Sequence, residues 1–215
     1  APYKTTDLTP ITLLASTPYV FAVNAQSQAN TMNEFVALSR TQKLAMATPG
    51  LGTSGHIVLE MLKQRSGIEL LHVPYKGAGP AIQSIITAET HITVSSPVTL
   101  KGHIDNGKLR ALAVSKSVRN PVLPNVPTMI QSGFPNFDVW AWFGVFAPPN
   151  LPPAIAQKLN EIVISAMKSP DYLSRIAALG LDVEPQSLGK FADMLSSETE
   201  RWKQLIESAK ITMDE

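Results

Sequence analysis

The chain has 215 residues and a mass of 23.2 kDa, enough for one large domain or two small ones. Its 18 Lys and Arg residues nearly balance its 17 Asp and Glu residues, and no basic stripe is present, which argues against nucleic-acid binding. No apolar run approaches the roughly 20 residues of a membrane-spanning helix, and the first residues lack the pattern of a signal peptide. An exported protein would therefore be present here in a processed or trimmed form.

Cysteine is absent, which excludes disulfides, thiolate metal sites and a cysteine nucleophile. Its absence is compatible with an oxidising compartment but does not establish one. The four histidines, at positions 56, 72, 91 and 103, follow no metal-binding spacing, so we expect no metal site. No phosphate-loop motif and no catalytic pair of carboxylates is evident, and the sequence predicts neither a catalytic residue nor a cofactor.

Short strands alternate with helices along the first part of the chain. Thr31 and Glu34 form a capping box that predicts a helix to about Arg40, and Gly67 and Gly107 are typical helix stops. Strands are expected at 11–14, 19–23, 44–47, 70–73, 91–95 and 110–114, and further helices at 54–65, 81–88 and from Pro97. This alternation predicts an α/β lobe with a mostly parallel sheet, helices on both faces and a ligand site at one sheet edge.

The pattern changes after residue 114. Residues 120–127 read as an extended proline-rich segment, with Pro127 opening a short helix, and residues 138–147 as an apolar strand. Three helices follow, at 153–168, 170–180 and 187–209, each with an apolar stripe or a clear cap. We therefore predict two parts, a ligand-binding lobe over residues 1–136 and a return strand with three helices over residues 137–215.

The sharpest local signal is the first glycine loop, residues 49–54, which follows a strand and opens a helix. Small residues let the backbone approach a ligand, and the unpaired amides of the first helical turn suit an anion. Gly50, Gly52 and Gly55 also fit the dinucleotide pattern G-x-G-x-x-G, but no acid follows the next strand to hold a ribose. A tight turn, an anion site and a dinucleotide site are all compatible with the sequence of this loop.

The second glycine loop, residues 74–80, joins another strand to a helix. The Tyr75 hydroxyl and the Lys76 ammonium lie beside Gly77 and could bind a carboxylate. The alternative is that Tyr75 packs in the core while Lys76 points to water. Trp140 and Trp142 share one strand face, where packing is the simpler role.

Several stretches, taken together and in order, resemble one family. The second glycine loop resembles the signature loop of the Bug-type periplasmic solute receptors, the substrate-binding subunits of tripartite tricarboxylate transporters. Five more stretches agree in order and spacing, at residues 7–14, 50–56, 107–114, 123–128 and 142–148. Known members begin with a further segment, so the chain resembles a periplasmic-binding-protein-like second lobe with a C-terminal return into an incomplete first lobe.

The resemblance implies a non-enzymatic, periplasmic receptor that captures a small organic carboxylate and delivers it to membrane subunits of a transporter. The ligand-binding residues expected from the loops and strand ends are Thr48, Gly50, Gly52, Thr53, Ser54, Tyr75, Lys76, Gly77 and Ser95. Two alternatives remain: a dinucleotide-binding oxidoreductase that uses residues 50–55, and a fragment without ligand binding. Missing opening strands would bare apolar surface on the C-terminal helices, so we also expect self-association.

Overall fold

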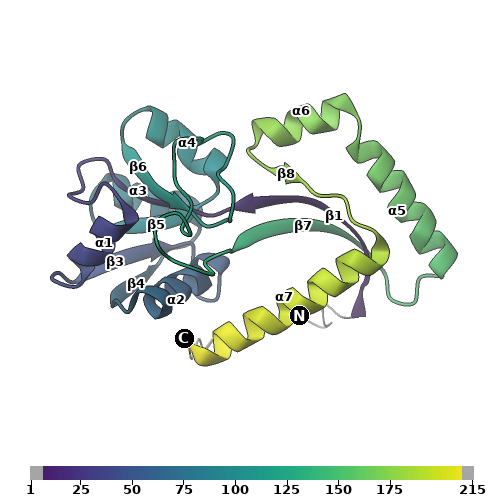
Figure 1. Cartoon of the computed structure of the whole chain (residues 1–215), viewed down its shortest axis with the longest axis horizontal. Helices are drawn as coiled ribbons and strands as arrows, with labels where there is room; N and C mark the ends of the chain where they lie inside the picture. The colour runs from purple at the N-terminus through teal and green to yellow at the C-terminus, as the bar shows by residue number, and fades with distance from the viewer. Residues whose placement is uncertain (1–6, 210–215) are drawn as a thin grey trace. The chain divides into compact units, whose positions relative to one another are not determined.

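The computed structural model describes residues 7–209 of the chain (Figure 1). By contacts between residues, it divides into two compact units, Ala1–Thr17 with Trp142–Lys203 and Pro18–Ala141 with Gln204–Glu215. The predicted boundary near residue 136 stays a prediction.

The unit built on Pro18–Ala141 contains a five-stranded sheet in the order β4-β3-β5-β2-β6 (Figure 1). Its strands are β2 (Val20–Asn24), β3 (Leu44–Thr48), β4 (Leu70–Pro74), β5 (Ile92–Ser95) and β6 (Leu109–Val114). Its helices are α1 (Met32–Ser39), α2 (Ser54–Ser66), α3 (Ala78–Ile86) and α4 (Pro97–Asp105). Strand β3 pairs in parallel with β4 and β5, whereas β2 is antiparallel to β5 and β6. Four strands therefore run one way, and the expected mostly parallel α/β sheet is confirmed.

Helices cover both faces of this sheet. Helices α3 and α4 form one apolar cluster with Val20, Ala22 and Ala47. Because side chains alternate along a strand, Thr48 points to the opposite face, and Gly55 of α2 lies against it. Phe21, which alternates with Val20, is also fully buried.

Local signals explain where these helices begin and end. The Thr31 hydroxyl accepts the Glu34 amide at 3.1 Å, and the Glu34 carboxylate accepts the backbone amides of Asn30 and Thr31. Gly67 ends α2 with a left-handed φ of 62°. Helix α3 begins at Ala78, three residues before the expected start, because Gly77 takes a φ of 111° and serves as its N-cap.

The short helix expected at Pro127 is wrong. The Val114 amide donates to Pro127 O at 2.9 Å, and the Met129 amide donates back to Val114 O at 2.8 Å. This parallel bridge beside β6 holds the backbone extended at Thr128, and only a single turn follows, in which Thr128 O accepts the Ser132 amide at 3.0 Å.

The other unit contains a three-stranded sheet in the order β7-β1-β8. Its elements are β1 (Thr9–Pro18), β7 (Trp140–Ala147), β8 (Asp182–Val183), α5 (Pro153–Met167), α6 (Pro170–Ala178) and α7 (Leu188–Ser208). The buried Asn160 side chain of α5 donates to Ile11 O at 2.7 Å and to Gln186 O at 2.9 Å, which fastens this helix to β1. Within residues 7–209, no helix has the length and apolar character required to cross a membrane.

Candidate functional site

The predicted site segments meet where β3, β4 and β5 end, at the edge of the five-stranded sheet that the carboxyl ends of these strands form. Strands β3, β4 and β5 run in the same direction, so their last residues, Thr48, Pro74 and Ser95, lie at the same edge. Strand β2 runs the other way and starts at this edge, where Val20 pairs with Ser95. In open α/β sheets this is the edge where ligands bind.

The two glycine loops contact each other directly. The Tyr75 amide donates to Thr48 O at 2.9 Å, and the Gly77 amide donates to Pro49 O at 2.9 Å. A Cβ at Gly50 would lie 3.3 Å from Tyr75 O, and the φ of Gly50 is 147°. Position 50 therefore requires glycine both for its backbone conformation and for the approach of the second loop.

The start of α2 is left without a side-chain cap. Thr53 occupies the N-cap position, but its hydroxyl donates to Gly50 O at 2.7 Å instead of accepting an amide of the helix. The first amides of α2, from Ser54 onward, therefore point toward the sheet edge without the usual Thr cap. Together with the positive end of the helix dipole, this arrangement suits a negatively charged group.

The Gly52 amide is already occupied. Gly52 adopts a left-handed φ of 66°, and its N–H donates to Nδ1 of His56 at 3.2 Å. This bond turns the loop back on the first turn of α2. Among the amides expected to face a ligand, that of Gly52 thus has a structural partner within the loop.

Two histidines stack beneath the first glycine loop. The His56 and His72 ring centroids are 4.0 Å apart with an interplanar angle of 16°. His72 Nε2 lies 2.6 Å from the hydroxyl of Thr48, which is fully buried. No spacing in the sequence links positions 56 and 72; the pair forms because α2 packs on β4.

Both rings favour the uncharged form. Burial lowers the pKa of His56, with a raising effect from Glu60 and a lowering effect from Lys63. Burial, followed by the charges of His56 and Lys63, lowers the pKa of His72 to about 4. Neither ring is charged at neutral pH, so the stack brings no positive charge to the loop.

Tyr19, which the sequence did not single out, also lies at this edge. It precedes β2, and its amide and carbonyl both bond Ser115, at 2.8 Å each. Burial raises the pKa of its phenol, and a hydrogen bond with the Ser54 side chain lowers it in part. Tyr19 therefore orients the Ser54 side chain at the first residue of α2.

The remaining predicted residues divide between core and solvent. The Tyr75 ring packs against the cluster of α3 and α4, and its buried hydroxyl has no hydrogen-bond partner among the described residues. Lys76 is exposed. In this loop the half-buried Tyr75 ring packs beside the core while Lys76 faces solvent, and whether either side chain contacts a ligand stays a prediction.

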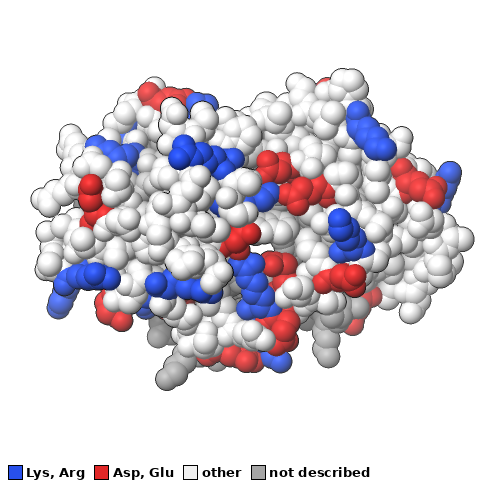
Figure 2. Space-filling view, in the orientation of Figure 1, with Lys and Arg blue, Asp and Glu red and all other residues white. Residues whose placement is uncertain are grey.

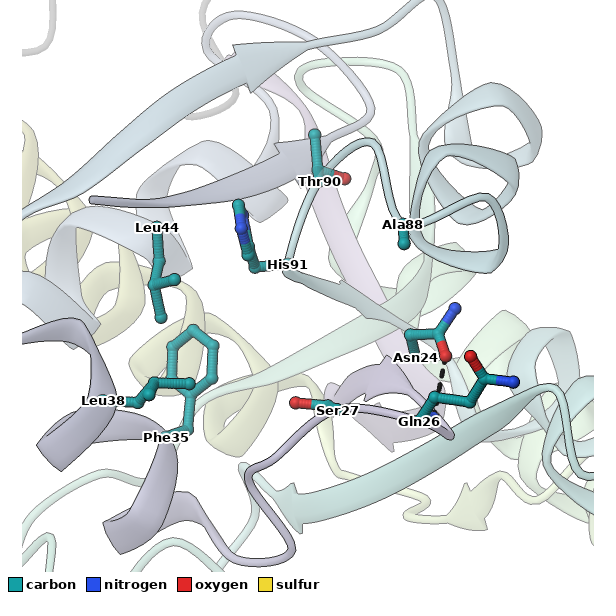
Figure 3. Close-up of a pocket in the computed structure, with 9 residues that line it drawn as sticks. All are labelled: Asn24, Gln26, Ser27, Phe35, Leu38, Leu44, Ala88, Thr90 and His91. Carbon is teal, nitrogen blue, oxygen red and sulfur yellow. Dashed lines mark hydrogen bonds between the residues drawn. The ribbon is translucent and has the colours of Figure 1, made fainter. Parts of the chain in front are cut away.

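A pocket of about 240 Å³ lies at the opposite edge of the sheet (Figure 3). Its floor is apolar, with Phe35 and Leu44, and His91 lines its wall. The His91 Nδ1 accepts the Ala45 amide at 3.0 Å, so that ring is held by the sheet. This pocket contains none of the predicted ligand-binding residues.

Charge does not gather into a single binding surface. On the face shown in Figure 2, basic and acidic side chains are interspersed and much of the surface is uncharged. Within residues 7–209, no group of three His, Asp or Glu side chains is placed to hold a metal ion.

Comparison with known proteins identifies the family. Residues 1–211 match the family described as tripartite tricarboxylate transporter family receptor. The chain belongs to this family. It is 35% identical over 209 residues to a UPF0065 protein from the tcbD-tcbE intergenic region of Pseudomonas sp. strain P51, covering 95% of this chain and 62% of that protein. It is 30% identical to BugT of Bordetella pertussis, covering 94% of this chain and 63% of BugT.

Two solved structures with bound dicarboxylates show the same fold. An R. palustris protein, Rpa4515, solved with adipate, has a TM-score of 0.86 and 26% identity, covering 98% of this chain and 71% of that one. MatC from Rhodopseudomonas palustris, solved with bound malate, has a TM-score of 0.79 and 30% identity, covering 93% and 69%. The chain therefore spans a little under two thirds of the curated relatives named above and about 70% of these two receptor structures.

Proposed function

We propose that the chain is the larger part of a periplasmic solute-binding protein that captures a small organic carboxylate without transforming it. The observation that carries this proposal is the uncapped start of α2 beside the second glycine loop. Thr53 donates its hydroxyl to Gly50 O at 2.7 Å and leaves the first helical amides directed at the sheet edge. Amides at a helix start bind carboxylates well, because their donors are fixed and the helix dipole favours the anion.

The predicted residues would have different roles in this site. Gly50, Gly52 and Gly77 shape the two loops through their left-handed backbone. Thr53 holds the first loop by donating its hydroxyl to Gly50 O. The amide of Ser54 and the hydroxyl of Ser95 would contact the ligand, the latter through water where the distance is long. The full set that we propose for ligand binding is Thr48, Gly50, Gly52, Thr53, Ser54, Tyr75, Lys76, Gly77 and Ser95.

The ligand class is supported by relatives. Rpa4515 was solved with adipate and MatC with malate, and both ligands are dicarboxylates. The first loop offers neutral donors rather than a guanidinium or a metal, which is enough for a carboxylate when the donors are preorganised. We infer that the intact receptor takes a carboxylate of similar size.

Localisation and partners follow from the family. We infer a periplasmic location and delivery of the ligand to the membrane subunits of a tripartite tricarboxylate transporter. Self-association is the further partner that we propose for this chain, because α5 exposes Ile155, Leu159 and Ile162 on one side. These residues recur at helical spacing and form a continuous apolar stripe.

The amide at the start of α2 can be removed selectively. Ser54 is the first helical residue, and Thr53 before it is extended, with φ −73° and ψ 163°, so Ser54→Pro fits both residues while deleting the N–H. Ser54→Ala is the matched control, since it keeps the amide and removes only the hydroxyl. A hydrogen bond from an amide to a charged group contributes about 1.5–3 kcal/mol. Ser54→Pro should therefore bind adipate or malate about ten- to a hundredfold more weakly than Ser54→Ala in calorimetric titration. Equal affinities of the two variants would exclude the helix start from the site.

A further inference from the structure

The histidine pair beneath the first glycine loop is not used by the proposed carboxylate contacts. His56 lies in the first turn of α2 and His72 in the edge strand β4, and their rings stack with centroids 4.0 Å apart. His56 is 8% exposed, so one ring of the pair is buried although both are titratable. The hydrogen bonds of the ring nitrogens show what this buried stack does in the fold.

Each ring bonds one end of the loop. His56 Nδ1 accepts the Gly52 N–H at 3.2 Å, so Nδ1 carries no proton and the neutral ring has its proton on Nε2. His72 Nε2 lies 2.6 Å from the Thr48 hydroxyl, and that hydroxyl is 3.4 Å from both the amide and the carbonyl oxygen of Gly50. The pair therefore fixes the loop at Thr48 and at Gly52, on either side of its tightest turn.

A proton would break this arrangement in two ways. A protonated His56 has an N–H at Nδ1, which would then face the Gly52 N–H with no acceptor between them. A proton on either ring also places a positive charge on the face of the other at 4.0 Å, and a second charge there would be repelled.

The surrounding charged side chains do not offset the cost of protonating either ring. From α2, the Glu60 carboxylate favours a charged His56, but Lys63 opposes it and is itself paired with Glu60 at 3.1 Å. From β4, His72 faces His56, and His56 and Lys63 are the charged groups acting on His72. With burial added, the pair stays uncharged at neutral pH.

We propose that His56 and His72 are positioning residues that hold the first glycine loop in its ligand-binding form while both rings are uncharged, and that one proton on the pair releases the loop. The ligand affected is the small carboxylate, so the inference rests on the proposed function. The contact on which it depends is the hydrogen bond from the Gly52 amide to His56 Nδ1, which can be observed without any ligand.

The loop itself is the first readout. In the ¹⁵N-labelled chain at about pH 7.5, the His56 ring nitrogens should report a proton on Nε2 and none on Nδ1. As the pH is lowered and the ring nitrogens report a charged His56, the Gly52 amide resonance should move with that protonation. Its protection from hydrogen exchange should fall about fivefold, as expected for one lost hydrogen bond. A Gly52 amide that stays unchanged while His56 becomes charged would overturn the proposal.

Two variants separate this effect from general acid sensitivity. His56→Asn places an oxygen acceptor as many bonds from the backbone as Nδ1 but cannot be charged, so its Gly52 amide should be insensitive over the same pH range. His103→Gln removes a histidine of α4 outside the loop and should keep the wild-type response. An identical pH response of wild type and His56→Asn would also overturn the proposal.

Ligand binding is the second readout, with adipate and malate as probes. The ratio of affinities at pH 7.5 and at a pH where the ring nitrogens show His56 charged should be about fivefold larger for wild type than for His56→Asn. Protonation of the ligand itself does not affect this comparison, because both proteins are measured with the same ligand at the same pH. Equal ratios would contradict control of the site by the pair. If neither protein binds either probe at any pH, the proposed function fails, and the loop measurement alone still tests the histidine bond.

Discussion

Glycine is required at position 55 by the space beside it. A Cβ there would lie 2.8 Å from Cδ of Pro49, whose carbonyl oxygen is held by the Gly77 amide at 2.9 Å. The proline ring has no flexible end that could move away. We therefore expect Gly55→Ala to lower the free energy of unfolding by about 1–3 kcal/mol, the usual effect of overpacking, in urea titrations.

Gly102 provides the control for that substitution. It lies in the interior of α4, and nothing is within 4 Å of a Cβ built there. Replacing an open helical glycine by alanine is expected to stabilise a protein by about 0.5–1 kcal/mol. If Gly55→Ala and Gly102→Ala had the same effect on stability, the close approach of α2 to Pro49 would be wrong.

The low pKa of His72 predicts how stability depends on pH. Its folded-state pKa, about 4, is below the ordinary histidine value of 6.5, so the unfolded chain binds a proton more readily than the folded protein. This contribution to stability is complete above pH 6.5 and is lost progressively as the pH falls from 6.5 toward 4.

The measurement is the urea midpoint at a series of pH values across that window. His72→Gln keeps a polar group at the position of Nε2 and cannot be charged, so its midpoint should fall less steeply with pH than that of wild type. Parallel slopes for the two proteins would show that His72 is not buried in the uncharged form.

At the scale of the element, α5 presents an apolar stripe to solvent. Ile155 is 49% exposed, Leu159 36% and Ile162 52%, while the opposite side of the helix buries Ala156 and Asn160. Each exposed side chain would gain about 1.5–3 kcal/mol if it were fully buried against a partner. The chain should therefore self-associate in a concentration-dependent way in sedimentation velocity.

Substitution of Leu159 and Ile162 by lysine should shift that equilibrium toward the monomer. Val118→Ser is the matched control, because Val118 is 57% exposed but lies outside the C-terminal helices. A wild-type chain that stays monomeric at all concentrations would exclude the stripe as the contact. So would an equal effect of the lysine substitutions and of Val118→Ser on the association.

Most elements of the sheet could be predicted because their boundaries carry strong local signals. Thr31, Gly67 and Pro97 mark helix ends that the structure places within a residue or two of the expected positions. Strand β8, with only two residues, has no periodicity of its own and forms because Ser16 and Ala15 of β1 pair with it. The error at Pro127 has the same origin, since a bridge to Val114 overrides the local preference.

The candidate site was predictable in outline but not in its contacts. Strand-to-helix loops with glycines identify the sheet edge, because parallel strands bring their ends together. Two contacts depend on the packing of α2 against β4: the hydrogen bond from the Gly52 amide to His56, and the stacking of the His72 ring on the His56 ring. Tyr75 illustrates the same limit: its sequence context fits a ligand contact or a core ring equally well, and only the structure shows its ring against the cluster of α3 and α4.

For the whole molecule, family membership and the site geometry point in the same direction. The chain matches the receptor family over residues 1–211 and shares the fold of receptors solved with adipate and malate. Because it spans about 62% of the Pseudomonas P51 relative and 63% of BugT, the affinity of this chain by itself is a separate quantity from that of those longer proteins. The place where a ligand contacts this chain can nevertheless be measured directly.

The most direct test is a titration of the ¹⁵N-labelled chain with adipate and with malate, followed through its backbone amide resonances. The account predicts that the largest shifts fall on Thr53, Ser54 and Gly55 and on Lys76 and Gly77, at the sheet edge where β3 and β4 end. Shifts concentrated instead around His91 and Phe35, at the opposite edge of the sheet, would contradict it.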